Sequence, residues 1–155
     1  MTSPEPSEEA RRQAVVAEAL TWVGTPFHHE ARLKGKGVDC AQLLIGVYSA
    51  PGVDVIEAFE PKHYSYQWHL HRSEEIYLTI LRQLGHEIPG PPLPGDVAVW
   101  KVGRAYSHAA IVIDWPFMVH ACAPPLGRCL RENALESALK LAKLPVRFFS
   151  AWEST

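Results

Sequence analysis

The sequence predicts a single α+β domain, with helices in the first half of the chain and an antiparallel sheet in the second. Apolar residues recur at helical spacing before residue 85, whereas short β-prone runs separated by turn residues dominate after residue 95. Helices first and strands later is the order typical of α+β proteins. A length of 155 residues is that of one domain, so we expect residues 1–155 to fold as one unit.

Composition and charge exclude several functional classes. Hydrophobic residues make up 47% of the chain and charged residues 21%, which is typical of a globular protein. The net charge of -2, without a basic block, argues against nucleic acid and anionic membranes as partners. No stretch approaches the roughly 18 consecutive apolar residues of a membrane span. Residues 1–9 are acidic and proline-bearing, unlike a secretory signal, so we expect cytoplasmic synthesis and no membrane insertion.

The first predicted element is a helix that begins after Ser7 and ends at Gly24. Its helical spacing is carried by Val15, Val16, Ala19, Leu20 and Val23. Residues 1–8 ahead of it are expected to form a flexible tail. A glycine-bearing loop is predicted at residues 24–38.

A second helix is predicted to follow this loop and to be buried on nearly all sides. Asp39, followed three residues later by Gln42 and then by an apolar run, has the pattern of a capping box. Asp39 should therefore be the N-cap, and Cys40 should lie in the first turn. A run that is apolar on nearly every side indicates a central helix rather than a surface one.

A third helix is predicted to open at Ser73 and to stop at Gly85, whereas residues 63–71 follow no recognisable period. The third helix should present one apolar face, made of Ile76, Ile80, Leu81 and Leu84. A proline-rich stretch at residues 89–95 ends regular structure.

The second half of the chain is predicted to be mostly strands. Short β-prone runs occur at residues 97–100, 109–113, 117–120 and 146–149, and their hairpin-like spacing indicates an antiparallel sheet. Residues 133–143 are predicted to form a further short helix.

Cys40 is the candidate nucleophile. A thiol reacts as the thiolate, and a helix N-terminus lowers its pKa through unpaired N–H groups and the helix dipole. The neighbouring carboxylate of Asp39 opposes thiolate formation, so a histidine partner is needed. His108 is the best candidate because it stands at the start of a predicted strand. His120 ends the next strand, and if the two strands pair, it can fix the tautomer of His108.

Four motifs in the correct order resemble the NlpC-type family of cell-wall cysteine peptidases. Residues 39–43 (Asp-Cys-Ala-Gln-Leu) resemble the Asp-Cys-Ser-Gly-Leu nucleophile motif of that family. Residues 94–96 (Pro-Gly-Asp) resemble its strand opener, residues 107–112 its catalytic-histidine strand, and residues 119–121 its third-residue strand.

The resemblance implies a papain-like fold, in which the cysteine helix packs on an antiparallel sheet that bears the histidines. It also implies a cysteine peptidase, with catalytic Cys40, His108 and His120, that cleaves peptidoglycan stem peptides, commonly between D-glutamate and a diamino acid. No cofactor and no metal are implied. Asp39 and Ser107 are predicted to contact substrate, Asp39 through a substrate amine as in relatives that recognise a free N-terminus.

A shorter resemblance concerns where the protein acts. Residues 68–71 (Trp-His-Leu-His), together with residues 75–78 and 107–110, resemble the phage-tail branch of the family, which includes gene-transfer-agent members. This implies a virion or virion-like particle and other tail proteins as partners. A cytosolic enzyme that recycles wall fragments would show the same absence of a signal peptide.

The sequence also departs from the family pattern and leaves other readings open. Gln42 replaces a family glycine, and Phe27 replaces a family tyrosine near the nucleophile, which makes an inactive structural or adaptor domain of a tail tip admissible. A different papain-like cysteine amidase is a further alternative.

The remaining histidines and cysteines suggest less specific possibilities. The candidate metal ligands in the sequence are His28, His29, His63, His69 and His71, but their spacing matches no compact zinc signature. Cys122 and Cys129 flank a predicted turn and are expected to be reduced and buried.

Overall fold

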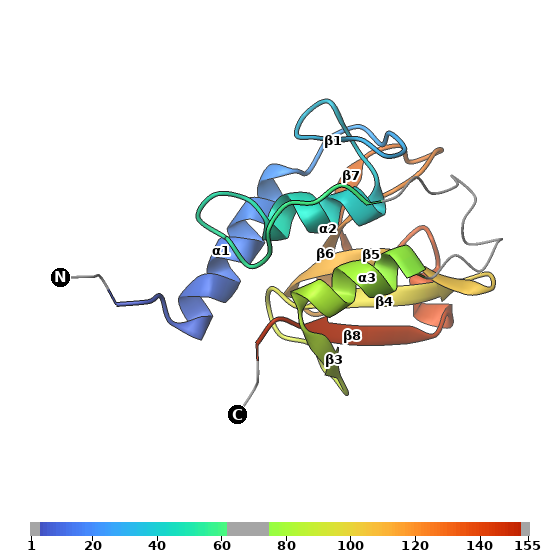
Figure 1. Cartoon of the computed structure of the whole chain (residues 1–155). Coiled ribbons are helices and arrows are strands. Elements are labelled where there is room, and N and C mark those ends of the chain that lie inside the picture. Colours follow the sequence, from blue (N-terminus) through green and yellow to red (C-terminus); the bar gives the residue numbers. More distant parts are fainter. Residues whose placement is uncertain (1–3, 62–74, 153–155) are drawn as a thin grey trace.

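The computed structural model describes residues 4–61 and 75–152 and has helices packed on an antiparallel sheet, as the sequence predicts (Figure 1). The helices are α1 (Glu8–Thr21), α2 (Cys40–Tyr48) and α3 (Glu75–Leu84), with a 3-10 turn, η2, at Leu141–Lys143. A two-stranded ribbon pairs β1 (Arg32–Leu33) with β2 (Gly37–Val38).

The main sheet has six strands in the order β3-β8-β4-β5-β6-β7, and all neighbours are antiparallel. Its strands are β3 (His86–Ile88), β4 (Val97–Val102), β5 (Ala105–Asp114), β6 (Phe117–Ala121), β7 (Cys129–Asn133) and β8 (Val146–Ser150). The runs predicted at residues 97–100, 109–113, 117–120 and 146–149 are confirmed as β4, β5, β6 and β8.

Helix α1 begins where its capping residue predicts. The Ser7 hydroxyl accepts a hydrogen bond from the backbone N–H of Ala10, so Glu8, the last residue of the expected tail, is already helical. Leu20 and Val23, two of the residues that carry the helical spacing, are 40% and 42% exposed. They therefore do not belong to the buried face. The buried face instead includes Arg12.

Two predictions about regular structure are wrong. Residues 133–143 do not form a helix: the first of them ends β7, and only the η2 turn is helical. The Asn133 side chain accepts a hydrogen bond from the N–H of Leu135, a local turn that competes with helix formation. The loop predicted at residues 24–38 contains the β1-β2 ribbon, and the start predicted for α3 at Ser73 lies outside the described residues.

The apolar core forms two layers, one on each face of the sheet. Helices α1 and α2 lie over one face, where Leu43, Ile111 and Val119 belong to a large cluster (Figure 1). The other face carries Trp100 and Met118, which pack with Leu141 of η2. The segment predicted as a helix therefore covers the second face of the sheet. No helix among the described residues is long and apolar enough to cross a membrane.

A buried ion pair fastens α1 to the strand opener of β4. Arg12 Nη1 donates to Asp96 Oδ1 at 2.8 Å and to the Pro94 carbonyl at 2.9 Å, while Asp96 Oδ2 accepts from the N–H of Leu93. The side chains of Arg12 and Asp96 are 6% and 1% exposed. The Pro-Gly-Asp motif thus has a structural role here, because its carboxylate neutralises a buried guanidinium.

We predict that Asp96→Asn lowers the free energy of unfolding by about 3 kcal/mol, because it leaves the buried Arg12 with the 44% exposed Glu8 carboxylate as its counter-charge. Urea unfolding of the purified protein measures this. The matched control is Glu87→Gln, which breaks the exposed Glu87–Arg147 pair and should change stability by less than about 1 kcal/mol. Equal small effects of both substitutions would contradict this account of the ion pair.

Candidate active site

Asp39 caps α2 and fixes the position of Cys40, as the sequence predicts. Asp39 Oδ1 accepts from the N–H of Gln42 at 2.8 Å, and its Oδ2 accepts from the N–H of Glu30 at 2.7 Å. Cys40 is the first residue of α2, and the helix interior behind it is buried. The thiol therefore stands at a helix N-terminus that the surrounding backbone holds rigidly.

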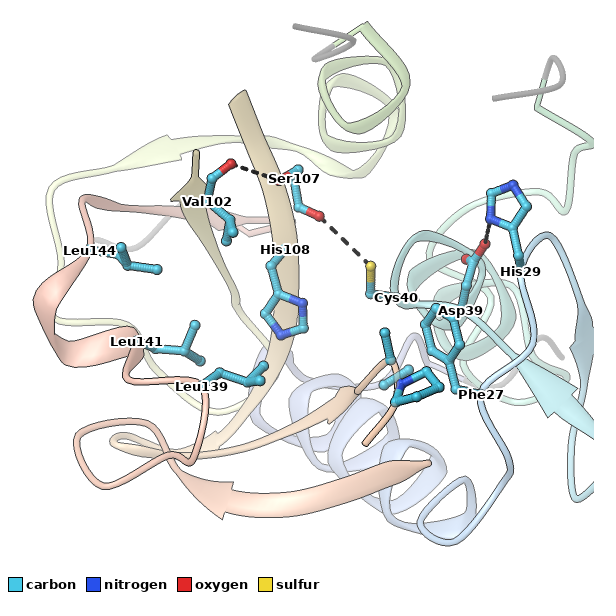
Figure 2. Close-up of a pocket in the computed structure, with 13 residues that line it drawn as sticks. Phe27, His29, Asp39, Cys40, Val102, Ser107, His108, Leu139, Leu141 and Leu144 are labelled. Atoms are coloured by element: carbon cyan, nitrogen blue, oxygen red, sulfur yellow. Dashed lines mark hydrogen bonds and ion pairs between the residues drawn. The ribbon is translucent and has the colours of Figure 1, made fainter. Parts of the chain in front are cut away.

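The Cys40 thiol is protonated in the resting site. Burial, and secondly the negative charge of Asp39, raises the pKa of Cys40 to about 12. Hydrogen bonds from the Tyr77 side chain and from backbone N–H groups at the helix start act in the opposite direction but are outweighed. Sγ lies 3.8 Å from the Ser107 carbonyl oxygen, to which the thiol donates (Figure 2). The helix N-terminus alone thus does not create a thiolate, and the Asp39 carboxylate opposes thiolate formation, as expected from the sequence.

His108 lies on β5 and is the first member of a hydrogen-bonded chain of side chains. Its Nε2 is 2.8 Å from Nδ1 of His120 on β6, and Nε2 of His120 is 2.6 Å from Oε1 of Glu132 on β7. The His120 side chain is fully buried, whereas that of Glu132 is 21% exposed. The prediction that the two histidine rings lie next to each other is confirmed, and Glu132 adds a third member to the hydrogen-bonded series.

The register of three strands explains this cluster. Val119 pairs with Ile111 on one side and with Arg131 on the other. Side chains alternate between the two faces of a sheet, so the even-numbered residues His108, His120 and Glu132 fall on one face of neighbouring strands. This is the face that also bears Trp100, whose ring lies 6.1 Å from that of His108.

The partners of the two rings determine where their protons lie. Burial lowers the pKa of His120 to about 4, and burial with the nearby His120 lowers the pKa of His108 to about 3, so both rings are neutral near pH 7. A carboxylate only accepts hydrogen bonds, so Nε2 of His120 carries its proton and Nδ1 accepts from Nε2 of His108. Nδ1 of His108 is then unprotonated, which is the state that a general base requires.

A cavity of about 270 Å³ brings the thiol and the base together. Figure 2 shows Cys40 at the start of α2 facing β5, with Ser107 and His108 on the opposite wall. Most of the remaining wall is apolar and includes Leu139, Leu141 and Leu144. The cavity therefore offers one polar end for chemistry and an apolar side that excludes water.

The two predicted substrate contacts both line this cavity. The Asp39 side chain is 4% exposed, and its oxygens already accept backbone N–H groups, so its capping role is established while its contact with substrate stays a prediction. His29 Nδ1 lies 3.8 Å from Asp39 Oδ2 at the same end of the cavity (Figure 2). Ser107 lines the cavity and its carbonyl accepts from Cys40.

The two departures from the family motif have different positions. Gln42 is buried, and its side-chain oxygen accepts a hydrogen bond from Arg32 Nη1 at 3.2 Å. Gln42 does not line the cavity. Phe27 does line the cavity, so the ring contributes an apolar surface where a tyrosine would add a hydroxyl. The substitution at Gln42 is thus accommodated within the fold, and only the one at Phe27 alters the cavity wall.

Sequence reasoning missed two residues of the site, Glu132 and Tyr77. Glu132 lies in a segment whose strand was not predicted, and its register with β6 depends on the turn at residues 122–128. Tyr77 is a fully buried polar aromatic residue on α3, a helix predicted from its apolar face. A tyrosine within an otherwise apolar stripe was the available signal, since a buried hydroxyl needs a hydrogen-bonding partner.

The other polar candidates from the sequence are placed as follows. His28 and His29 are described, and Nδ1 of His28 is 3.2 Å from the His29 carbonyl oxygen. His63, His69 and His71, and with them residues 68–71 of the phage-tail resemblance, lie outside the described residues. Cys122 and Cys129 are buried free thiols, as expected.

Comparison with solved structures identifies the fold. The NlpC/p60 domain of the peptidoglycan hydrolase SagA superposes with a TM-score of 0.58 at 18% identity, covering 88% of this chain and 96% of that domain. The peptidoglycan hydrolase RipB of Mycobacterium tuberculosis gives a TM-score of 0.63 at 16% identity, covering 99% of this chain and 74% of RipB. NlpC2 of Trichomonas vaginalis gives 0.66 at 14% identity, covering 96% of this chain, which spans 50% of NlpC2.

These similarities show that the chain has the papain-like α+β fold of NlpC/p60 domains, as the resemblance in its motifs implied. A scan of the sequence against protein-family models finds no match, and a search of curated proteins finds none either.

We predict that alkylation of Cys40 by iodoacetamide accelerates continuously from about pH 6 to about pH 9, because a thiol whose pKa is raised forms more thiolate with each increase in pH. Mass spectrometry of the modified peptides measures the rate. Cys40 should still react before the fully buried Cys122 and Cys129. A rate that is already maximal near pH 6 would mean that a thiolate–imidazolium pair exists in the resting protein.

Proposed function

We propose that this chain is a cysteine peptidase that hydrolyses peptide bonds in peptidoglycan stem peptides, of the D-glutamyl–diamino acid type. The observation that carries the proposal is the shared cavity of Cys40 and His108, in which the histidine is oriented through His120 by a carboxylate. A nucleophile, a base and an orienting group in this order are the parts that thiol hydrolysis requires. Two of the solved proteins with this fold are described as peptidoglycan hydrolases.

Proton transfer is the first step of the proposed mechanism. The resting thiol points to the Ser107 carbonyl and has a raised pKa, so it needs a base at the moment of attack rather than a preformed ion pair. Nδ1 of His108 accepts the proton as Sγ bonds to the scissile carbonyl carbon. The imidazolium that forms is stabilised through His120, whose far nitrogen donates to the Glu132 carboxylate.

Stabilisation of the oxyanion falls to the start of α2. Backbone N–H groups of Cys40 and Ala41 act on the sulfur in the resting site, and the dipole of α2 adds partial positive charge there. The oxygen of the tetrahedral intermediate forms beside this sulfur, so the same helix start supplies its donors. Tyr77 presents a further hydroxyl at the nucleophile, on a different element from the family tyrosine that Phe27 replaces.

Breakdown of the intermediate completes the cycle. His108 returns the proton to the leaving amine, and a thioester remains on Cys40. Water then attacks this thioester with His108 again accepting a proton, which releases the carboxylic acid and restores the thiol. The apolar wall of Leu139, Leu141 and Leu144 limits other water in the cavity.

The proposed setting is a phage or phage-like tail, where the chain would act on intact wall beside other tail proteins. This part rests on the sequence resemblance at residues 75–78 and 107–110 together with residues 68–71. An inactive adaptor with the same fold is the alternative, and the orientation of His108 by two further side chains favours the enzyme over it.

We predict that Cys40→Ala abolishes the release of new amines from purified peptidoglycan, because it removes the nucleophile while leaving the Asp39 cap of α2 in place. Chromatography of the digested fragments measures the release and identifies the bond. Cys129→Ala, which removes a buried thiol that does not line the cavity, is the matched control and should keep activity.

Intact sacculi and free stem peptides should be compared in the same assay. Activity on sacculi supports a tail enzyme, whereas activity on free peptides alone supports a recycling enzyme. Equal hydrolysis by the wild type and Cys40→Ala would refute the peptidase assignment.

A further inference from the structure

Cys122 is a buried thiol beside the orienting histidine that the proposed peptide hydrolysis does not use. Its Sγ lies 3.4 Å from Nε2 and 3.6 Å from Nδ1 of His120. Cys122 is fully buried, as is His120. Among residues 4–61 and 75–152, His120, Cys122 and Glu132 bring one nitrogen, one sulfur and one oxygen to within 4.8 Å of one another.

We propose that these three side chains form an inhibitory site for a zinc-class divalent cation, in which the metal takes the His120 nitrogen that otherwise donates to Glu132. A thiol, an imidazole and a carboxylate together are the ligands of Zn²⁺ rather than of Mg²⁺ or Ca²⁺. One thiolate and one carboxylate also balance the charge of a divalent cation, which a buried site requires.

The present spacing is close to that of a coordinated metal. Zinc bond lengths of about 2.0–2.3 Å place tetrahedral ligand atoms about 3.4–3.6 Å apart. The Nε2 to Sγ distance of 3.4 Å has this length, but Sγ is also 3.6 Å from Nδ1, so the thiol lies beside the ring and must shift toward the lone pair of Nε2 to share a metal with it. The 2.6 Å between Nε2 and Glu132 Oε1 must open by about 0.8 Å. The Glu132 side chain is partly exposed, so it has room to move, and the cation would reach the site from this side.

Ser137 supports the carboxylate in this position. Its hydroxyl donates to Oε1 of Glu132 at 3.2 Å, and its oxygen accepts from the N–H of Leu139. Hydrogen bonds to ligating carboxylates are a usual support of metal sites. On binding, the Cys122 thiol forms a sulfur–metal bond and releases its proton to solvent.

Metal at this site reverses the tautomers on which the proposed catalysis depends, and this step rests on the proposed function. With Nε2 of His120 bound to metal, the proton of the neutral ring lies on Nδ1 and is donated to Nε2 of His108. The proton of His108 then lies on Nδ1, the nitrogen that would accept from Cys40. The cation therefore blocks the base without touching the nucleophile.

The test is a titration of the full chain with ZnCl₂, followed by calorimetry and by metal analysis after dialysis. Wild type should bind one equivalent, and MgCl₂ should not bind. Cys122→Ala should weaken zinc binding by at least about tenfold, since even outer-shell partners matter about 10- to 100-fold. The matched control is Cys129→Ala, which removes another buried thiol and should bind as the wild type does.

Two further variants make the outcome decisive. Cys122→Ser replaces the thiol by a weaker ligand of similar size and should also lose affinity, which covers the case that Cys122→Ala unfolds. Cys40→Ala should bind zinc normally; if it loses binding while the Cys122 variants keep it, the metal sits on the proposed nucleophile and the proposal is overturned. Because binding is measured without turnover, a protein that binds zinc but hydrolyses nothing would refute the peptidase and leave the metal site standing.

Discussion

The hydrogen-bonded chain from Glu132 through His120 to His108 is the interaction on which the rest of the site depends. Each member lies on a different strand, so the chain forms only when β5, β6 and β7 pair in one register. The Glu132 carboxylate at its end can only accept hydrogen bonds, so it determines which nitrogen of each histidine ring carries the proton. Helix α2 places Cys40 in the same cavity as His108, at the other end of this series of hydrogen bonds from Glu132. The Arg12–Asp96 ion pair holds α1 against the start of β4, and β4 pairs with β5, the strand that carries His108.

Burial and the helix N-terminus act against each other at Cys40. Backbone N–H groups and Tyr77 favour the thiolate, but desolvation and Asp39 outweigh them. The same burial keeps His108 neutral. In the proposed mechanism, a neutral thiol next to a neutral imidazole transfers its proton only when substrate is attacked. The raised pKa of Cys40 also slows its alkylation and oxidation near neutral pH. Asp39 thus disfavours the thiolate of Cys40. The same residue stabilises the structure, because it caps α2 and accepts a hydrogen bond from the N–H of Glu30.

Local patterns predicted the parts of the fold that depend on local physics. The Ser7 and Asp39 caps, the start of α2 and the strands at β4, β5, β6 and β8 follow from capping chemistry and side-chain period. The pairing of His108 with His120 followed from a short hairpin. Glu132 could not be predicted in the same way, because a seven-residue turn at residues 122–128 separates its strand from β6 and no local pattern sets the register across it. Residues 133–143 are predicted to be a helix, but the turn at Asn133 and the packing of Leu141 against the sheet give them another conformation, and no local pattern specifies the second contact.

Nitrogen NMR of the histidine side chains tests the ordering of protons most directly. At neutral pH, both His108 and His120 should be uncharged, each with its proton on Nε2 and an unprotonated Nδ1. These signals should stay unchanged until the pH falls toward the lowered pKa values of about 4 for His120 and about 3 for His108. A proton on Nδ1 of either ring, or an imidazolium signal for His108 near pH 7, would contradict the chain of donors that ends at Glu132.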